Sequence, residues 1–89
     1  MIISGTDLRI VRLGSGKTTN EMADIAGVKT RKTYENWEKN KGAPSMNQFL
    51  RMVQHCGFDA SVLVKLYMER DNFEERVDVM SARLEQTAH

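Results

Sequence analysis

Apolar residues recur every three or four positions along the chain, in segments separated by glycine or proline, and this is the pattern of amphipathic helices. Gly14, Gly27, Gly57 and the only proline, Pro44, lie where these segments are expected to end. No segment alternates apolar and polar residues up to a hairpin turn, as antiparallel strands do. The pattern therefore predicts an all-α protein, with a bundle of five helices followed by a C-terminal helix.

Residues that favour helix termini set the boundaries of the first two helices. Thr6 is expected to cap the first helix, which Gly14 should end, and either Thr18 or Thr19 should cap the second. Gly27 should end the second helix, because glycine readily adopts the left-handed conformation of a helix C-cap.

A third helix is predicted from a cap at Thr30 to about Asn40, with Tyr34 and Trp37 on its inner side at i, i+3 spacing. We expect both aromatic rings to pack in the core rather than to stack on a ligand. Glu38 is expected to make a structural hydrogen bond or ion pair rather than a contact with a base.

The second half of the chain continues the helical pattern. Ser45 and Gln48 form a capping box for a fourth helix, and a fifth opens at Phe58. The tail is again helical in pattern, with apolar residues spaced four, three and four apart: Phe73, Val77, Met80 and Leu84. We therefore expect one domain at residues 1–68 and a helical extension at residues 69–89.

Charge is distributed unevenly, although the net charge is only +1. Residues 1–44 carry +3 and residues 45–89 carry −2, and five basic and two acidic side chains lie within residues 29–41. A basic segment neutralises phosphates and releases counterions, which favours nucleic-acid binding. A solvated helix face would have the same composition, so charge alone leaves both interpretations open.

The second and third helices, joined by residues 27–30, have the features of a helix-turn-helix. Ala23 allows close approach, Gly27 permits the turn, and the polar outer side of the third helix is suited to a major groove about 12 Å wide. The side chains expected to contact base edges are Thr30, Arg31, Glu35 and Asn36. Those expected to contact the phosphate backbone are Lys17, Thr18, Thr19, Lys29, Lys32, Thr33 and Lys39.

The start of the second helix has two interpretations. Its N–H groups near Thr18 and Thr19, together with Lys17, are suited to a DNA phosphate. Alternatively, residues 14–16 form only an interhelical loop. A nucleotide-binding phosphate loop is not expected, because Val11 stands where its first glycine belongs and no strand precedes it.

The runs NEMADIAGV (residues 20–28) and TRKTYENWE (residues 30–38), followed by Pro44, resemble the Cro/repressor-type (XRE-like) helix-turn-helix domain. The most specific matches are Ala23, four residues before a Gly-Val pair, and the Trp-Glu pair that precedes a Gly-x-Pro loop. The resemblance covers about residues 6–67. The form of the motif in this chain is similar to that of small phage- and plasmid-associated regulators. It implies a lambda-repressor-like fold and sequence-specific DNA binding.

The chain departs from the common form of this family at two places. The turn is one residue longer, and we assign the additional residue to Lys29, so that Thr30 becomes the cap. Thr19 stands where the family often has a glutamine that binds phosphate.

The apolar stripe of the tail also has two interpretations. It folds back on its own domain, or it pairs with a second copy across a two-fold interface, which we favour because the core of so short a chain is small. We therefore expect a transcriptional regulator that binds double-stranded DNA at a palindromic operator as a homodimer and acts as a repressor by blocking polymerase. The alternative is a protein-interaction module, such as an antitoxin or adaptor, that binds a protein partner through its C-terminal helix.

Other chemistries have little support in the sequence. His55 and Cys56 are adjacent, but no further cysteine or histidine stands at metal-ligand spacing, so we expect no metal and no cofactor. No recognisable catalytic set of serine, histidine and acid is present, so we do not expect an enzyme. A single cysteine, no apolar run of about 20 residues and no secretion signal lead us to expect a cytoplasmic protein without a membrane partner.

Overall fold

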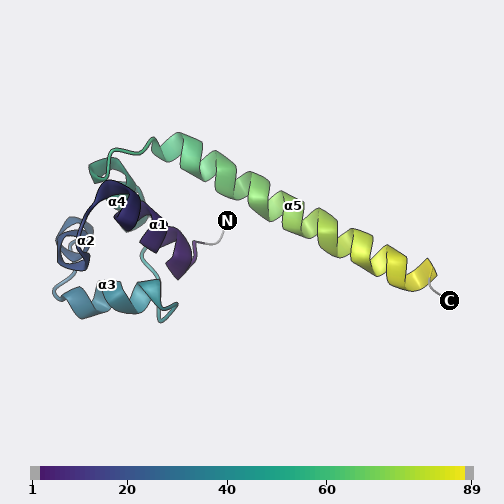
Figure 1. Cartoon of the computed structure of the whole chain (residues 1–89), viewed down its shortest axis with the longest axis horizontal. Coiled ribbons are helices and arrows are strands. Elements are labelled where there is room, and N and C mark those ends of the chain that lie inside the picture. Colours follow the sequence, from purple (N-terminus) through teal and green to yellow (C-terminus); the bar gives the residue numbers. More distant parts are fainter. Residues whose placement is uncertain (1–2, 88–89) are drawn as a thin grey trace. The chain divides into compact units, whose positions relative to one another are not determined.

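The computed structural model describes residues 3–87, apart from the side chains of residues 75, 77–79 and 81–87. Regular structure in this range is helical throughout: α1 (Gly5–Ser15), α2 (Thr19–Ala26), α3 (Arg31–Glu38), α4 (Met46–His55) and α5 (Ala60–Thr87) (Figure 1). The all-α prediction is confirmed for the described residues. Two units are distinguished, a globular one at Ile3–Ala60 that holds α1 to α4, and α5.

The start and end of α1 differ from the prediction. Ser4, not Thr6, is the N-cap: its side chain accepts the N–H of Asp7 at 3.2 Å, and the Asp7 carboxylate accepts the N–H of Ser4 at 2.9 Å. This reciprocal pair satisfies two N–H groups that the helix itself leaves without partners. Gly14 lies inside α1 rather than at its end, and the helix terminates at Gly16, which has a left-handed φ of 72°.

Other predicted termini are confirmed. Thr18 caps α2 and Gly27 ends it with a φ of 75°. The side chain of Thr30 accepts the N–H of Thr33 at the start of α3. At the start of α4, the capping box between Ser45 and Gln48 is formed, with distances of 2.8 and 3.1 Å.

The chain turns sharply after α3, two residues before the predicted end of this helix. Asn40 has a left-handed φ of 62°, which asparagine tolerates better than most residues, and its side-chain oxygen accepts the N–H of Gly5 at 2.8 Å. The residue that stops α3 therefore also holds the beginning of α1.

The core of the globular unit is formed by side chains from all four of its helices: Leu8, Val11, Met22, Ala23, Ala26, Tyr34, Trp37, Phe49, Met52 and Val53. Tyr34 and Trp37 are 0% and 8% exposed, which confirms their prediction as core residues. Their rings meet edge to face with centroids 6.2 Å apart. The inner side of α3 is thus occupied by packing, and only its other sides remain for a ligand.

The C-terminal region forms one continuous helix, where the sequence analysis expected a fifth helix and a separate tail helix. α5 has 28 residues, and the predicted boundary between residues 68 and 69 falls inside it. The segment contains no glycine or proline that would end a helix. Within the described range, no helix combines the length and apolar character that crossing a bilayer requires.

Candidate nucleic-acid interface

Two sides of α3 differ in exposure, as expected of a helix that packs on one side and is open on the other. Opposite the buried aromatic pair, the predicted ligand-contacting residues form a polar surface, which we call the α3 surface. Its exposed members are Lys29, Thr30, Arg31, Lys32 and Lys39, and its half-buried members are Thr33, Glu35 and Asn36. The structure thus brings the eight residues predicted in this segment onto α3, the turn before it and the residue that follows it, Lys39, with none of them buried.

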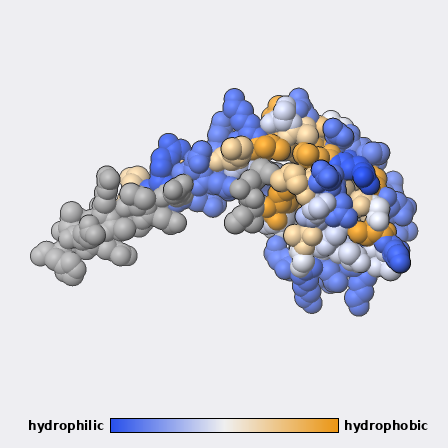
Figure 2. All heavy atoms as spheres, turned by 180° about the vertical axis from the view of Figure 1, so that it is seen from behind, coloured by the Kyte–Doolittle hydropathy of each residue, from blue (hydrophilic) through white to orange (hydrophobic). Residues whose placement is uncertain are grey.

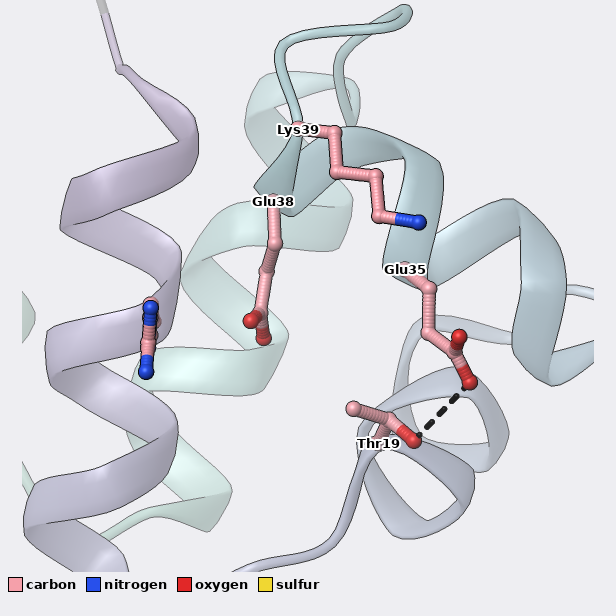
Figure 3. Close-up of a pocket in the computed structure, with 5 residues that line it drawn as sticks. Thr19, Glu35, Glu38 and Lys39 are labelled. Carbon is pink, nitrogen blue, oxygen red and sulfur yellow. Dashed lines mark hydrogen bonds between the residues drawn. The ribbon is translucent and has the colours of Figure 1, made fainter.

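An ion pair and a hydrogen bond connect two of these side chains, Arg31 and Glu35, with Thr19 of α2. The Arg31 guanidinium forms an ion pair with Glu35, one turn further along α3, with 2.9 Å between Nε and Oε1. Thr19 Oγ1, at the start of α2, donates to the same oxygen at 3.3 Å, as Figure 3 shows. Glu35, which the sequence assigned to base reading, therefore also holds Arg31 and links the two helices in the protein without ligand.

The start of α2 carries a carboxylate that the sequence analysis did not take into account. Glu21 Oε1 accepts the N–H of Thr18 at 3.0 Å, and Thr18 Oγ1 accepts the N–H of Glu21 at 3.1 Å. These backbone and side-chain hydrogen bonds with Thr18 lower the pKa of Glu21. Its negative charge stands beside the predicted phosphate contacts at Lys17, Thr18 and Thr19, and it favours the interpretation of this segment as a structural cap.

A second ion pair fixes α3 against α1. Arg12 donates to Glu38 through Nε at 2.7 Å and through Nη2 at 3.1 Å, in a bidentate arrangement that confirms the predicted structural role of Glu38. The Tyr34 hydroxyl lies beside this pair and donates to the carbonyl of Leu8 at 3.4 Å. Burial, followed by the neighbouring Glu38 carboxylate, raises the pKa of Tyr34. α3 is therefore held at its C-terminal end by α1 and at its middle by α2.

The Glu38 ion pair should make the free energy of unfolding depend on pH. Burial alone would raise the pKa of Glu38, but the hydrogen bonds from Arg12, the neighbouring Tyr34 hydroxyl and the charge of Arg12 together lower it below its ordinary value of 4.5. The ionised carboxylate therefore stabilises the fold above about pH 4.5, and this contribution is lost as the pH falls through the folded-state pKa. In chemical unfolding between pH 7 and pH 3, Glu38→Gln should be less stable at pH 7 and lose less stability in acid than the unmodified chain.

The comparison isolates Glu38 because every other carboxylate, including Glu21, whose pKa is also lowered, is present in both proteins. Parallel curves of unfolding free energy against pH would contradict this assignment.

A hollow beside the α3 surface is lined by charged and polar side chains from three helices (Figure 3). It has a volume of about 410 Å³ and is lined by Arg9, Thr19, Glu35, Glu38 and Lys39. Its two carboxylates and two cations balance in charge. Arg9, an exposed residue of α1 that the sequence analysis did not assign, adds a further cation next to the α3 surface. In the sequence, the basic character of Arg9 and its position within the first helix were the only indications of this placement.

Comparison with protein-family models, curated proteins and solved structures finds no match for this chain. Among the described residues, no group of three or more histidine, cysteine or acidic side chains is arranged to hold a metal ion.

The residues predicted for a dimer interface all lie on α5. Phe73 and Met80 are each 61% exposed. The side chains of Val77 and Leu84 lie outside the described residues.

Proposed function

We propose that this chain is a sequence-specific DNA-binding transcriptional regulator that inserts α3 into the major groove and acts as a homodimer on a palindromic operator. The observation that carries the proposal is the α3 surface, where exposed Arg31, Lys32, Lys29 and Lys39 lie opposite a buried Tyr34–Trp37 pair. A short helix fixed on one side and basic on the other is what entry into a groove about 12 Å wide requires. In this proposal α2, the turn and α3 form a helix-turn-helix, and an occupied operator blocks polymerase.

The ion pair on α3 suggests how Arg31 is presented to a base. Glu35 binds the Nε of Arg31, which leaves both Nη groups for the O6 and N7 acceptors of a guanine. A guanidinium held in this way loses less side-chain entropy when it binds. Contact of Glu35 itself with a cytosine amino group, and of Asn36 with adenine, stay predictions.

Random-site selection with the purified full chain tests the proposal directly. We expect enrichment of one palindromic sequence, with binding that weakens steeply as salt rises. Absence of an enriched sequence, together with no salt-dependent binding to a duplex of mixed sequence, would overturn the proposal.

Two substitutions on the α3 surface should have different consequences for DNA binding. Arg31→Ala should weaken binding to the selected site by about 1–3 kcal/mol and relax the preference at one base pair. Lys32→Ala, a phosphate contact, should weaken binding to all duplexes alike and reduce the salt slope by about 1. Both are measured as Kd values on the selected and a scrambled duplex at several salt concentrations.

Lys65→Ala is the matched control, because this exposed lysine lies on α5 and has no predicted DNA contact. An equal loss on both duplexes for Arg31→Ala, or a loss confined to the selected duplex for Lys32→Ala, would contradict the assigned roles.

A further inference from the structure

The apolar stripe predicted in the tail continues toward the start of α5 and covers three heptads. One set of positions seven residues apart contains Leu63, Arg70, Val77 and Leu84, and the other contains Leu66, Phe73 and Met80. Positions three and four residues apart share one face of a helix, so these residues form a single line, which we call the heptad line. Leu66, Phe73 and Met80 are 52%, 61% and 61% exposed.

Exposed apolar side chains at heptad spacing are typical of helices that pair with another helix. Figure 2 shows one face of the molecule, on which hydrophilic residues cover much of the described surface and apolar areas lie between them. Val62 and Met68 are also exposed, but they lie off the heptad line and six positions apart, and isolated apolar side chains at a surface are ordinary. The heptad line is therefore the feature of α5 that requires a partner.

The line contains one charged residue, which restricts the possible partners. The Arg70 guanidinium lies over the ring of Tyr67, 4.7 Å from its centre. Its aliphatic stem can then cover apolar neighbours while its charge stays beside the line. Pairing of two copies of α5 is therefore favoured in an alignment that keeps the two Arg70 side chains apart.

Parallel pairing fails this requirement. It places equivalent positions of the heptad line opposite each other, so Arg70 meets Arg70 of the second copy. It also places Glu69, on one side of the heptad line, beside Glu74 of the second copy, which lies on the other side of its line. By symmetry this contact occurs twice. All these contacts are between like charges.

Antiparallel pairing removes each of these conflicts in one register. With Arg70 opposite Phe73 of the second copy, Leu63 faces Met80 and Leu66 faces Val77. Glu69 then lies beside Arg76 of the second copy, twice, and both side chains are exposed. A shift by one heptad in one direction places Glu69 beside Glu69 of the second copy, and a shift in the other direction places Arg76 beside Arg76 of the second copy. Both shifts bring like charges together, so a single register is favoured.

We propose that α5 pairs antiparallel with α5 of a second copy of this chain, in the register that places Arg70 opposite Phe73. This pairing specifies how the homodimer of the proposed function would form, and it rests on that homodimer. In this register Ala60 lies opposite residue 83 of the second copy, so a rise of about 1.5 Å per residue separates the two α5 N-termini by about 34 Å along the helix axis. This is close to the distance of about 34 Å between half-sites one DNA turn apart.

Cysteine cross-linking distinguishes the orientations. Full-length chains with Cys56→Ser, carrying either Leu63→Cys or Met80→Cys, are oxidised alone and after mixing. We expect disulfide-linked dimers in the mixture at least about fivefold above either chain alone, because residues 63 and 80 face each other only in the antiparallel register. Cross-linking of Leu63→Cys alone at the level of the mixture would show parallel pairing and overturn the proposal.

Charge reversal gives a second, independent test by sedimentation equilibrium of the full chain. Glu69→Arg should weaken dimerisation about tenfold, because it opposes Arg76 of the second copy, and Glu69→Arg with Arg76→Glu should restore it to within about threefold. In a parallel dimer Glu69→Arg would strengthen association, because it would face Glu74. That result, or a monomeric parent chain at tens of micromolar, would overturn the proposal.

Both tests are performed without DNA, so the two proposals fail separately. A monomeric chain that still binds its selected operator would overturn the pairing and the homodimer but leave the proposed DNA binding. A chain that pairs as described but shows no DNA binding would overturn the proposed function alone.

Discussion

Tyr34→Ala should remove roughly half or more of the free energy of unfolding of the globular unit at 25 °C. Tyr34 is 0% exposed, and it packs edge to face on Trp37 and donates to the carbonyl of Leu8. Removal of a buried aromatic side chain costs about 3–5 kcal/mol. A unit of this size has a total stability of only about 3–9 kcal/mol, at about 0.05–0.15 kcal/mol per residue. The loss is therefore comparable with the whole stability.

Denaturant unfolding followed by the fluorescence of Trp37, the only tryptophan, reports on this unit specifically. Tyr34→Phe is the matched control, because it keeps the ring and removes only the hydroxyl, at a cost of about 0.5–1.5 kcal/mol. A Tyr34→Ala chain with the denaturation midpoint of the unmodified protein would show that the ring contributes little to the core.

Gly5→Ala should cost about 3 kcal/mol, although alanine is ordinarily the better helix former. A Cβ atom at Gly5 would overlap the carbonyl oxygens of Trp37 and Glu38, which are backbone atoms that no side-chain rotation can move. α1 would have to shift away from the end of α3, and the hydrogen bond from the Gly5 N–H to Asn40 would be strained.

Gly14→Ala is the control within the same helix. Its Cβ would meet only the end of the Phe58 ring at 3.3 Å, which is a side chain that can turn aside. We expect a change between zero and a gain of about 1 kcal/mol from the improved helix propensity. Thermal or chemical unfolding of both variants tests the contrast, and equal effects at the two glycines would contradict the close approach of α1 to α3.

Features that depend on neighbouring residues could be predicted from the sequence. The caps at Thr18, Thr30 and Ser45 and the C-cap at Gly27 follow from contacts within four residues, and each is present. The cap of α1 was predicted wrongly because only Thr6 was considered, although Ser4, two residues earlier, is the one with an acid three residues later.

Features that depend on distant residues could not be predicted. The pairs Arg12–Glu38 and Gly5–Asn40 join residues 26 and 35 positions apart, and helical periodicity does not say which helix faces which. Likewise, the sequence placed Glu35 correctly on the polar side of α3 but carried no sign of its hydrogen bond with Thr19. The candidate surface was therefore foreseen as a set of residues, and its internal connections were not.

The first turn of α3 contains Arg31 and Lys32 and no acidic residue. The peptide dipoles of a helix make this end electropositive, so each cation there costs about 0.3–1 kcal/mol at low ionic strength. Selection for thermostability alone would favour aspartate or glutamate in their place. The first turn of α3 thus carries an unfavourable electrostatic interaction that a bound polyanion would relieve. The folded chain should therefore have a higher melting temperature in the presence of a polyanion.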